Sequence, residues 1–114
     1  CIIGANGCIG RFLNQLLLPY AKEIIKIDTA YSEIEGNQYN YDLTNNTVAD
    51  IDVLFEEVDI VFFSVTTDIF FKIFENVIPV LPENVIIVDT ISTKCNMEKY
   101  YKSIFQKYSL KYQI

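Results

Sequence analysis

Histidine is absent from this chain of 114 residues, and basic side chains are few. Without histidine, a reaction that needs a proton shuttle near neutral pH must take it from another residue type or from another part of the protein. Nine Lys and Arg residues stand against 15 Asp and Glu, for a net charge of −6. This balance argues against a nucleic-acid groove and against binding to an anionic membrane. No apolar run approaches the roughly 20 residues of a membrane span, so we expect neither nucleic acid nor membrane as a partner.

Paired cysteines are also lacking. The three cysteines, Cys1, Cys8 and Cys95, form no Cys-x-x-Cys motif. An odd number of cysteines without a signal peptide indicates free thiols in a reducing cytoplasm, and we predict no metal site. The chain also begins without Met and inside an apolar strand, so we expect further residues before Cys1.

What the chain does contain is a regular alternation of short apolar runs and helical patterns, with 51% hydrophobic residues, which excludes disorder. Apolar residues at helical spacing predict helices over residues 8–18, 48–58, 69–81 and 96–108. Runs rich in Ile, Val and Phe predict strands over residues 1–4, 23–28, 38–42, 59–65, 85–89 and 110–114, two of which (59–65 and 85–89) read as buried on both faces. Short connections between them are typical of right-handed βαβ units. The predicted fold class is α/β, a doubly wound Rossmann-type parallel sheet with three layers and helices on both faces, in one domain over residues 1–114.

A glycine-rich turn, G-A-N-G-C-I-G, joins the first strand to the first helix. A side chain at Gly7 would hold a pyrophosphate away from the backbone N–H groups, and Gly10 allows the helix to pack closely on the strand. The helix N-terminus offers unpaired donors and a partial positive charge to phosphates. We therefore predict dinucleotide binding by the residues of the turn, which are Gly4, Ala5, Asn6, Gly7, Cys8, Ile9 and Gly10.

Asp28 closes the second predicted strand, 18 residues after Gly10. A carboxylate at this place accepts hydrogen bonds from an adenosine ribose. Because it would repel a 2′-phosphate, it favours NAD over NADP as the cofactor. The simpler alternative is that the glycines only mark a turn and that Asp28 is a solvated strand end.

Polar residues follow the fourth and fifth predicted strands as well. Carboxyl ends of strands are where ligands bind in open α/β sheets, so we expect these loops to meet over a nicotinamide. We predict cofactor contacts for Ser64, Val65, Thr66 and Asp89. Thr67 or Asp68 would cap the following helix, and from spacing alone Ser92 and Lys94 fit a plain polar loop equally well.

Together these motifs resemble the N-terminal domain of prephenate dehydrogenases, including their arogenate-using relatives. The resemblance covers essentially the whole chain, and D-T-I-S-T-K over residues 89–94 is its most specific part. It is also carried by the turn, by Ser64-Val65 and by the run V-I-P-V-L-P-E-N-V-I-I-V-D. It implies oxidative decarboxylation of prephenate to 4-hydroxyphenylpyruvate, with hydride transfer to NAD, and a catalytic role for Ser92 beside the reacting hydroxyl.

The resemblance also raises expectations about residues outside this chain. In the family, a catalytic histidine lies in an H-P-x-x-G segment directly after the strand that begins here at Leu110. A helical C-terminal domain then completes the substrate pocket and the homodimer. We therefore expect residues 1–114 alone to bind dinucleotide without turning over prephenate or arogenate. Ala5, where the family usually has glycine, and Thr66, where it often has proline, depart from the family pattern.

Three other interpretations remain open. The spacing G-x-x-G-x-x-G, Asp28 and the segment Tyr41-Asp42-Leu43-Thr44 also resemble extended short-chain dehydrogenases and sugar-nucleotide epimerases, although no tyrosine has a lysine four residues later. A family of small-acid dehydrogenases related to the 3-hydroxyacid enzymes shares the Ser-Val loop. The third interpretation is a non-catalytic module that senses a dinucleotide.

Overall fold

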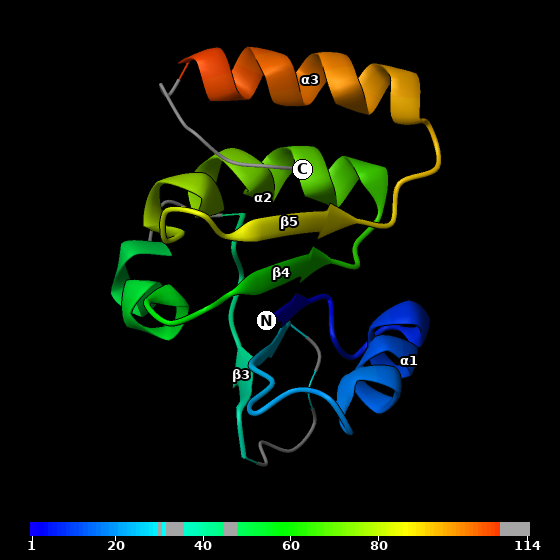
Figure 1. The fold of residues 1–114 in the computed structure, drawn as a ribbon, viewed down its shortest axis with the longest axis vertical. Coiled ribbons are helices and arrows are strands. Elements are labelled where there is room, and N and C mark those ends of the chain that lie inside the picture. Colours follow the sequence, from blue (N-terminus) through cyan, green and yellow to red (C-terminus); the bar gives the residue numbers. More distant parts are fainter. Residues whose placement is uncertain (30, 32–35, 45–47, 108–114) are drawn as a thin grey trace.

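The fold is α/β, with a five-stranded sheet in which all neighbouring strands are parallel (Figure 1). The strand order is β3-β2-β1-β4-β5. The computed structural model describes residues 1–29, 31, 36–44 and 48–107. Its elements, in chain order, are β1 (Ile2–Ile3), α1 (Cys8–Leu17), β2 (Lys26–Asp28), β3 (Gln38–Asn40), the 3-10 helix η1 (Val48–Phe55), β4 (Ile60–Phe63), α2 (Thr67–Val77), the 3-10 helix η2 (Ile78–Val80), β5 (Ile86–Asp89) and α3 (Lys94–Lys107).

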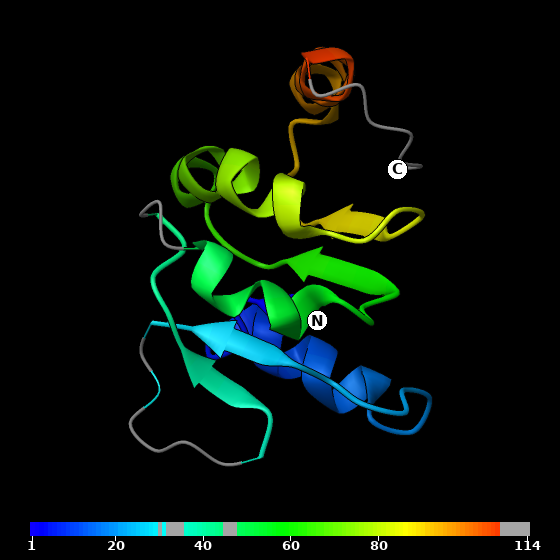
Figure 2. The same ribbon diagram turned by 90° about the vertical axis from the view of Figure 1, so that its left-hand side faces the viewer.

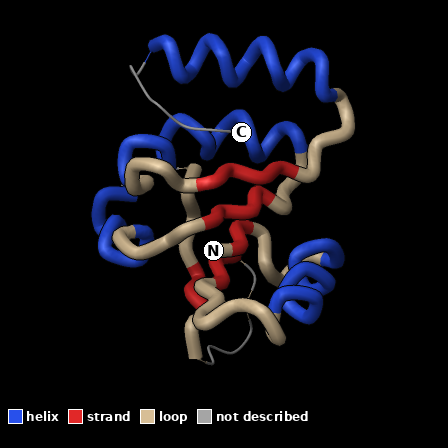
Figure 3. Tube along the Cα trace, viewed as in Figure 1, coloured by secondary structure: helices blue, strands red, loops and turns tan. Residues whose placement is uncertain are grey.

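The register of the strands aligns their carboxyl ends. Ile3 of β1 is in register with Ile27 of β2 and with Phe63 of β4, and Phe63 is in register with Asp89 of β5. The loops that follow these strands therefore leave the sheet along one edge, as Figure 3 shows for the central strands. This alignment brings the predicted site segments together.

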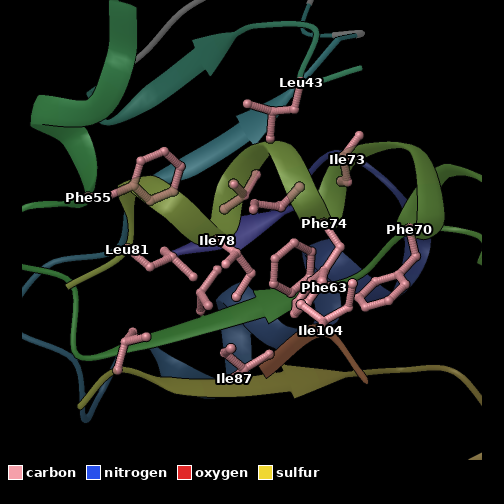
Figure 4. Packing of buried hydrophobic residues seen from close by; sticks show 14 of the residues in the cluster. Leu43, Phe55, Phe63, Phe70, Ile73, Phe74, Ile78, Leu81, Ile87 and Ile104 are labelled. Carbon is pink, nitrogen blue, oxygen red and sulfur yellow. The ribbon is translucent and has the colours of Figure 1, made fainter. Parts of the chain in front are cut away.

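The main core lies against one face of the sheet and is built largely from aromatic rings. Phe63 of β4 meets Phe70 and Phe74 of α2, with ring centroids 5.3 Å away in both cases (Figure 4). All three side chains are fully buried, and each contributes about 1.5–3 kcal/mol through burial alone. Alternate side chains of β4 and β5 point to the opposite face of the sheet from this core. Two of them, Ile60 and Ile86, are exposed. The prediction that these strands are buried on both faces is therefore wrong at these two positions.

Helix α1 buries only part of its apolar stripe. Gly10 is buried, and Leu13 and Leu17 are half-buried. Ile9, Phe12 and Leu16 are exposed, Phe12 to 61%. The apolar spacing predicted this helix correctly, but spacing does not reveal which apolar residues another element covers.

Helix α3 lies at one end of the molecule, beyond α2 and β5 (Figures 1 and 2). Its contact with α2 is aromatic. The ring of Tyr100 meets Phe71 edge-on at 4.8 Å, and that of Tyr101 meets Phe74 edge-on at 5.4 Å. Edge-to-face pairs of this kind contribute about 0.5–1.5 kcal/mol each beyond the area they bury.

Several predicted boundaries differ from the structure. The helix predicted over 69–81 is α2, which ends at Val77 and gives way to η2, because Pro79 has no N–H to continue the α-helix. The helix predicted over 48–58 is the shorter 3-10 helix η1, Val48–Phe55. The strands are shorter than predicted, and the strand predicted over 110–114 lies outside the described residues.

The N-cap of α2 is Thr66, without a hydrogen bond from its side chain, instead of Thr67 or Asp68. Asp68 lies in the first turn of the helix, where its negative charge is favourable next to the helix dipole. Among the described helices, none combines the length and the apolar character needed to cross a membrane.

Candidate functional site

Two glycines of the turn are required by close packing. Gly4 has φ +82°, and a Cβ there would lie 2.2 Å from the carbonyl oxygen of Ser64 at the end of β4. A Cβ on Gly10 would lie 2.3 Å from the carbonyl oxygen of Gly4. Neither contact is possible for a real side chain, so the approach of α1 to β1, and of β1 to β4, depends on these glycines.

Gly7 has a different environment. It is the N-cap of α1 with an extended backbone, and the nearest atom to a Cβ placed on it would be the Gly4 carbonyl oxygen at 3.4 Å. No side chain caps the helix, and the first N–H groups of any α-helix have no carbonyl partner within the helix. The N-terminus of α1, with Cys8 and Ile9 exposed, therefore presents backbone donors to solvent where the turn has no side chain in the way.

Asp28 faces this turn from the end of β2. Its Oδ2 accepts a hydrogen bond from the Asn6 N–H at 2.9 Å, and its Oδ1 accepts one from the Thr29 N–H at 2.7 Å. The carboxylate is half-buried. These bonds fix the acid beside the glycine turn, although the two residues Asn6 and Asp28 are 22 positions apart in the chain.

A cavity of about 650 Å³ lies at the carboxyl edge of the sheet, in front of Asp28 and the turn. Six of the predicted site residues line it, namely Gly4, Gly7, Asp28, Ser64, Val65 and Thr66. Most of the exposed wall is apolar. The other lining residues were not predicted to be part of the site in the main interpretation, and they are Ile3, Ile27, Thr29, Tyr41, Asp42, Leu43, Thr44, Ile69, Lys72 and Ile73.

A second carboxylate, Asp42, follows β3 at the same cavity. Its Oδ1 accepts hydrogen bonds from the Thr44 N–H at 2.9 Å and from the Thr44 hydroxyl at 2.6 Å. Both bonds favour the charged form and hold the pKa of Asp42 below its usual value. The adjacent Leu43 is buried, and its carbonyl accepts a hydrogen bond from the Asn76 side chain of α2 at 2.9 Å.

The remaining turn residues support the site without lining the cavity. Ala5 is buried, and its φ is not positive; among the described residues, positive φ occurs only at Gly4, Gly36 and Asn84. Ala5 is therefore unstrained at this position of the turn. Asn6 contributes its N–H to Asp28, and Cys8, Ile9 and Gly10 form the first turn of α1.

Asp89 and Ser92 lie one strand further along the same edge and do not line the cavity. The Asp89 carboxylate accepts hydrogen bonds from the Ile91 N–H at 2.9 Å and from the Tyr101 hydroxyl at 2.8 Å. Burial and the neighbouring Asp89 raise the pKa of Tyr101, so its hydroxyl stays protonated at neutral pH. Ser92 is exposed in the loop that Asp89 begins.

A second hollow, of about 870 Å³, lies at the opposite edge of the sheet, where the strands begin. Its wall includes Cys1, Ile25 and Asp59, which precede β1, β2 and β4. It contains none of the predicted site residues. This second hollow is larger than the cavity at the carboxyl edge. The cavity at the carboxyl edge is nevertheless the candidate site, because ligands of open parallel sheets bind at that edge.

Some of the unpredicted lining residues could have been found from their position directly after a predicted strand. Thr29 and residues 41–44 directly follow β2 and β3, so they leave the sheet at the same edge as the predicted site. Lys72 and Ile73 come from α2, and their position depends on how that helix packs, which no local pattern reveals.

The site combines backbone donors, two carboxylates, hydroxyl groups and an apolar wall. It can bind an anionic group at α1 and vicinal hydroxyls at Asp28. Across the described ranges, no group of three or more His, Cys, Asp or Glu side chains is placed to hold a metal ion. Comparisons of the chain with protein-family models, with curated proteins and with solved structures each find no match.

Proposed function

We propose that this chain is the NAD-binding domain of a prephenate or arogenate dehydrogenase. In this proposal the fold is a doubly wound Rossmann-type sheet of three layers, with helices on both faces. The strand order supports it, because successive strands are added on one side of β1 as far as β3 and then on the other side from β4. A dinucleotide binds at such a reversal of strand order.

One observation carries the proposal, which is that the glycine turn and an acid at the end of β2 meet on one cavity. The Asn6 N–H donates to Asp28 at 2.9 Å, and both Gly7 and Asp28 line the cavity. The pyrophosphate of NAD would bind at the N-terminus of α1, and the adenosine ribose would donate its hydroxyls to Asp28. The negative charge of the carboxylate favours NAD over NADP.

The apolar part of the wall suits an adenine ring. Leu43 comes from the segment after β3, and Ile69 and Ile73 come from α2. They lie on the same cavity as Asp28. Pockets for small molecules and cofactors are lined mostly by apolar side chains with a few polar groups that fix the orientation of the ligand.

For the reaction, a dinucleotide held by Asp28 and the glycine turn would supply, in its nicotinamide, the acceptor for the hydride of the substrate's ring carbinol. Ser92 is exposed at the carboxyl edge, and in the proposal its hydroxyl hydrogen-bonds the reacting hydroxyl of prephenate or arogenate. The proton acceptor and the helical domain that completes the substrate pocket and the homodimer are expected outside residues 1–114. We place the protein in the cytoplasm, in keeping with three free cysteines.

The test of this proposal is a calorimetric titration of the chain with NAD, in the wild type and in Asp28→Ala. Loss of the carboxylate removes its hydrogen bonds to the ribose, which weakens binding by about 1–3 kcal/mol, or roughly 5- to 150-fold. The same change should reduce the preference for NAD over NADP. Asp52→Ala is the matched control, because Asp52 is an exposed acid of η1 that does not line the cavity. Unchanged affinity and selectivity in Asp28→Ala would show that the assignment of Asp28 is wrong.

A second candidate is an extended short-chain dehydrogenase or sugar-nucleotide epimerase. Asp42 and Leu43 line the cavity, and in those enzymes an Asp-Leu pair reaches the adenine. Against it, no tyrosine in residues 1–114 is followed four positions later by lysine. Assays of the longest protein that the gene encodes separate the two: the first proposal expects NAD reduction with prephenate or arogenate, and the second expects conversion of a sugar nucleotide. A protein that binds NAD and converts neither would be a dinucleotide-sensing module.

A further inference from the structure

A buried tyrosine of α3 is hydrogen-bonded to the acid that ends β5. The Tyr101 hydroxyl donates to Asp89 Oδ2 at 2.8 Å, and Tyr101 is only 2% exposed. Asp89 Oδ1 accepts the N–H of Ile91 at 2.9 Å. One carboxylate thus joins α3 to the first turn of the loop that carries Ser92.

This loop, residues 90–93, is attached at its other positions too. The Thr90 hydroxyl donates to the Phe63 carbonyl of β4 at 3.4 Å. The Thr93 carbonyl accepts the Met97 N–H in the first turn of α3 at 3.3 Å. Ile91 is buried, whereas Ser92 is exposed. The start of the loop is therefore bonded to β4 and to Asp89, its last residue is bonded to α3, and Ser92 between them is exposed.

The strand order fixes where this loop lies relative to the cavity. Along the carboxyl edge, Asp28 ends β2, the glycine turn follows β1, Ser64 follows β4, and the loop follows β5. Phe63 and Asp89 are register partners, so residues 90–93 start beside Ser64. A dinucleotide with its adenosine ribose on Asp28 and its pyrophosphate on the turn would direct its nicotinamide half toward β4 and β5.

We propose that Tyr101 is a positioning residue that acts through Asp89 to hold the 90–93 loop against the nicotinamide half of the dinucleotide. The adenosine half is bound by Asp28, the turn and the cavity wall, without Tyr101. This inference rests on the proposed function, because it assumes that the site binds NAD. It assigns the two halves of the ligand to two separately controlled parts of the site.

The surroundings of Tyr101 make it suitable for this role. Its ring packs edge-on against Phe70 and Phe74 of α2, so the position of the hydroxyl is set by the core. Burial and the neighbouring Asp89 raise the pKa of Tyr101, so its hydroxyl keeps the proton that it donates to Asp89 at neutral pH. Tyr101→Phe removes the hydroxyl and retains the ring.

The experiment compares two ligands of the chain, NADH and ADP-ribose, which lacks the nicotinamide. For Tyr101→Phe we expect NADH to bind about tenfold more weakly, while ADP-ribose binds within about twofold of wild type. Asp89→Leu, which keeps the approximate size of the side chain and removes both acceptor oxygens, should give the same selective loss. Tyr100→Phe is the control, because Tyr100 belongs to the same aromatic cluster and the Tyr101–Asp89 bond is kept; it should leave both affinities unchanged.

The outcomes separate this inference from the proposed function. Equal losses for NADH and ADP-ribose in Tyr101→Phe and Asp89→Leu would mean a purely structural role and would overturn the inference. Unchanged NADH affinity in both variants would also overturn it, with NAD binding intact. If wild type binds neither ligand, the proposed function itself fails, and the inference fails with it.

Discussion

At the residue scale, the glycines of the turn have two different roles. Gly4 and Gly10 are needed because backbone atoms occupy the space of their missing side chains. A Cβ on Gly7 would make only an ordinary contact, with the Gly4 carbonyl oxygen at 3.4 Å, and its backbone, with φ −73° and ψ 172°, is allowed for any residue. The first role concerns folding, and the second concerns a ligand.

Alanine at two of these positions should separate the roles. Gly4→Ala combines a positive φ with a contact at 2.2 Å, and should lower the free energy of unfolding by about 3 kcal/mol or more. Gly7→Ala should lower it by less than about 1 kcal/mol, while its Cβ weakens NAD binding about tenfold or more by blocking the pyrophosphate. Urea denaturation and calorimetric titration measure the two effects. A Gly7→Ala protein with normal NAD affinity would contradict the placement of the phosphates.

Site residues within one strand–turn–helix unit could be predicted from the sequence, whereas contacts that depend on how separate elements pack could not. The turn and Asp28 have recognisable spacing, because the conformation of a strand–turn–helix unit restricts its residue types. The Tyr101–Asp89 bond has no such signal. It depends on how α3 packs on α2, and a tyrosine in a helix is an ordinary core residue until a partner for its hydroxyl is known.

At the element scale, the runs that became β4 and β5 were predicted because strands inside a parallel sheet are rich in Ile, Val and Phe. The same composition misled at Ile60 and Ile86, which are exposed, because a short apolar run does not show whether the second face of its strand is covered. The α-helices were predicted from spacing, and the position of Pro79 accounts for the early end of α2.

The helices α1 and α2 differ in the burial of their phenylalanine side chains, and this difference gives a second prediction for stability. Phe74 of α2 is fully buried among aromatic rings, whereas Phe12 of α1 is 61% exposed. Phe74→Ala should lower the free energy of unfolding by about 3–5 kcal/mol. Phe12→Ala should change it by no more than about 0.5 kcal/mol. Urea denaturation of both variants is the measurement, and a similar loss in both would mean that α1 is buried in solution by a partner or by another part of the protein.

At the scale of the whole molecule, the site suits a ligand that carries negative charge although the chain itself is acidic. The net charge is −6, and the carboxylates Asp28 and Asp42 line the cavity together with Lys72. Phosphates in such a site would be bound mainly by backbone N–H groups and the dipole of α1, which need no cationic side chains. The carboxylates would then select for hydroxyl groups and against additional phosphates.

The central claim, that this cavity binds NAD, is tested most directly by isothermal titration of the wild-type chain with NAD. We predict one site per chain, half-saturated at or below about 1 mM NAD, which corresponds to at least about 4 kcal/mol of binding free energy. ADP-ribose should compete for the site, and NADP should bind about tenfold more weakly, a difference of about 1.4 kcal/mol. Absence of saturable binding by either dinucleotide would contradict the claim.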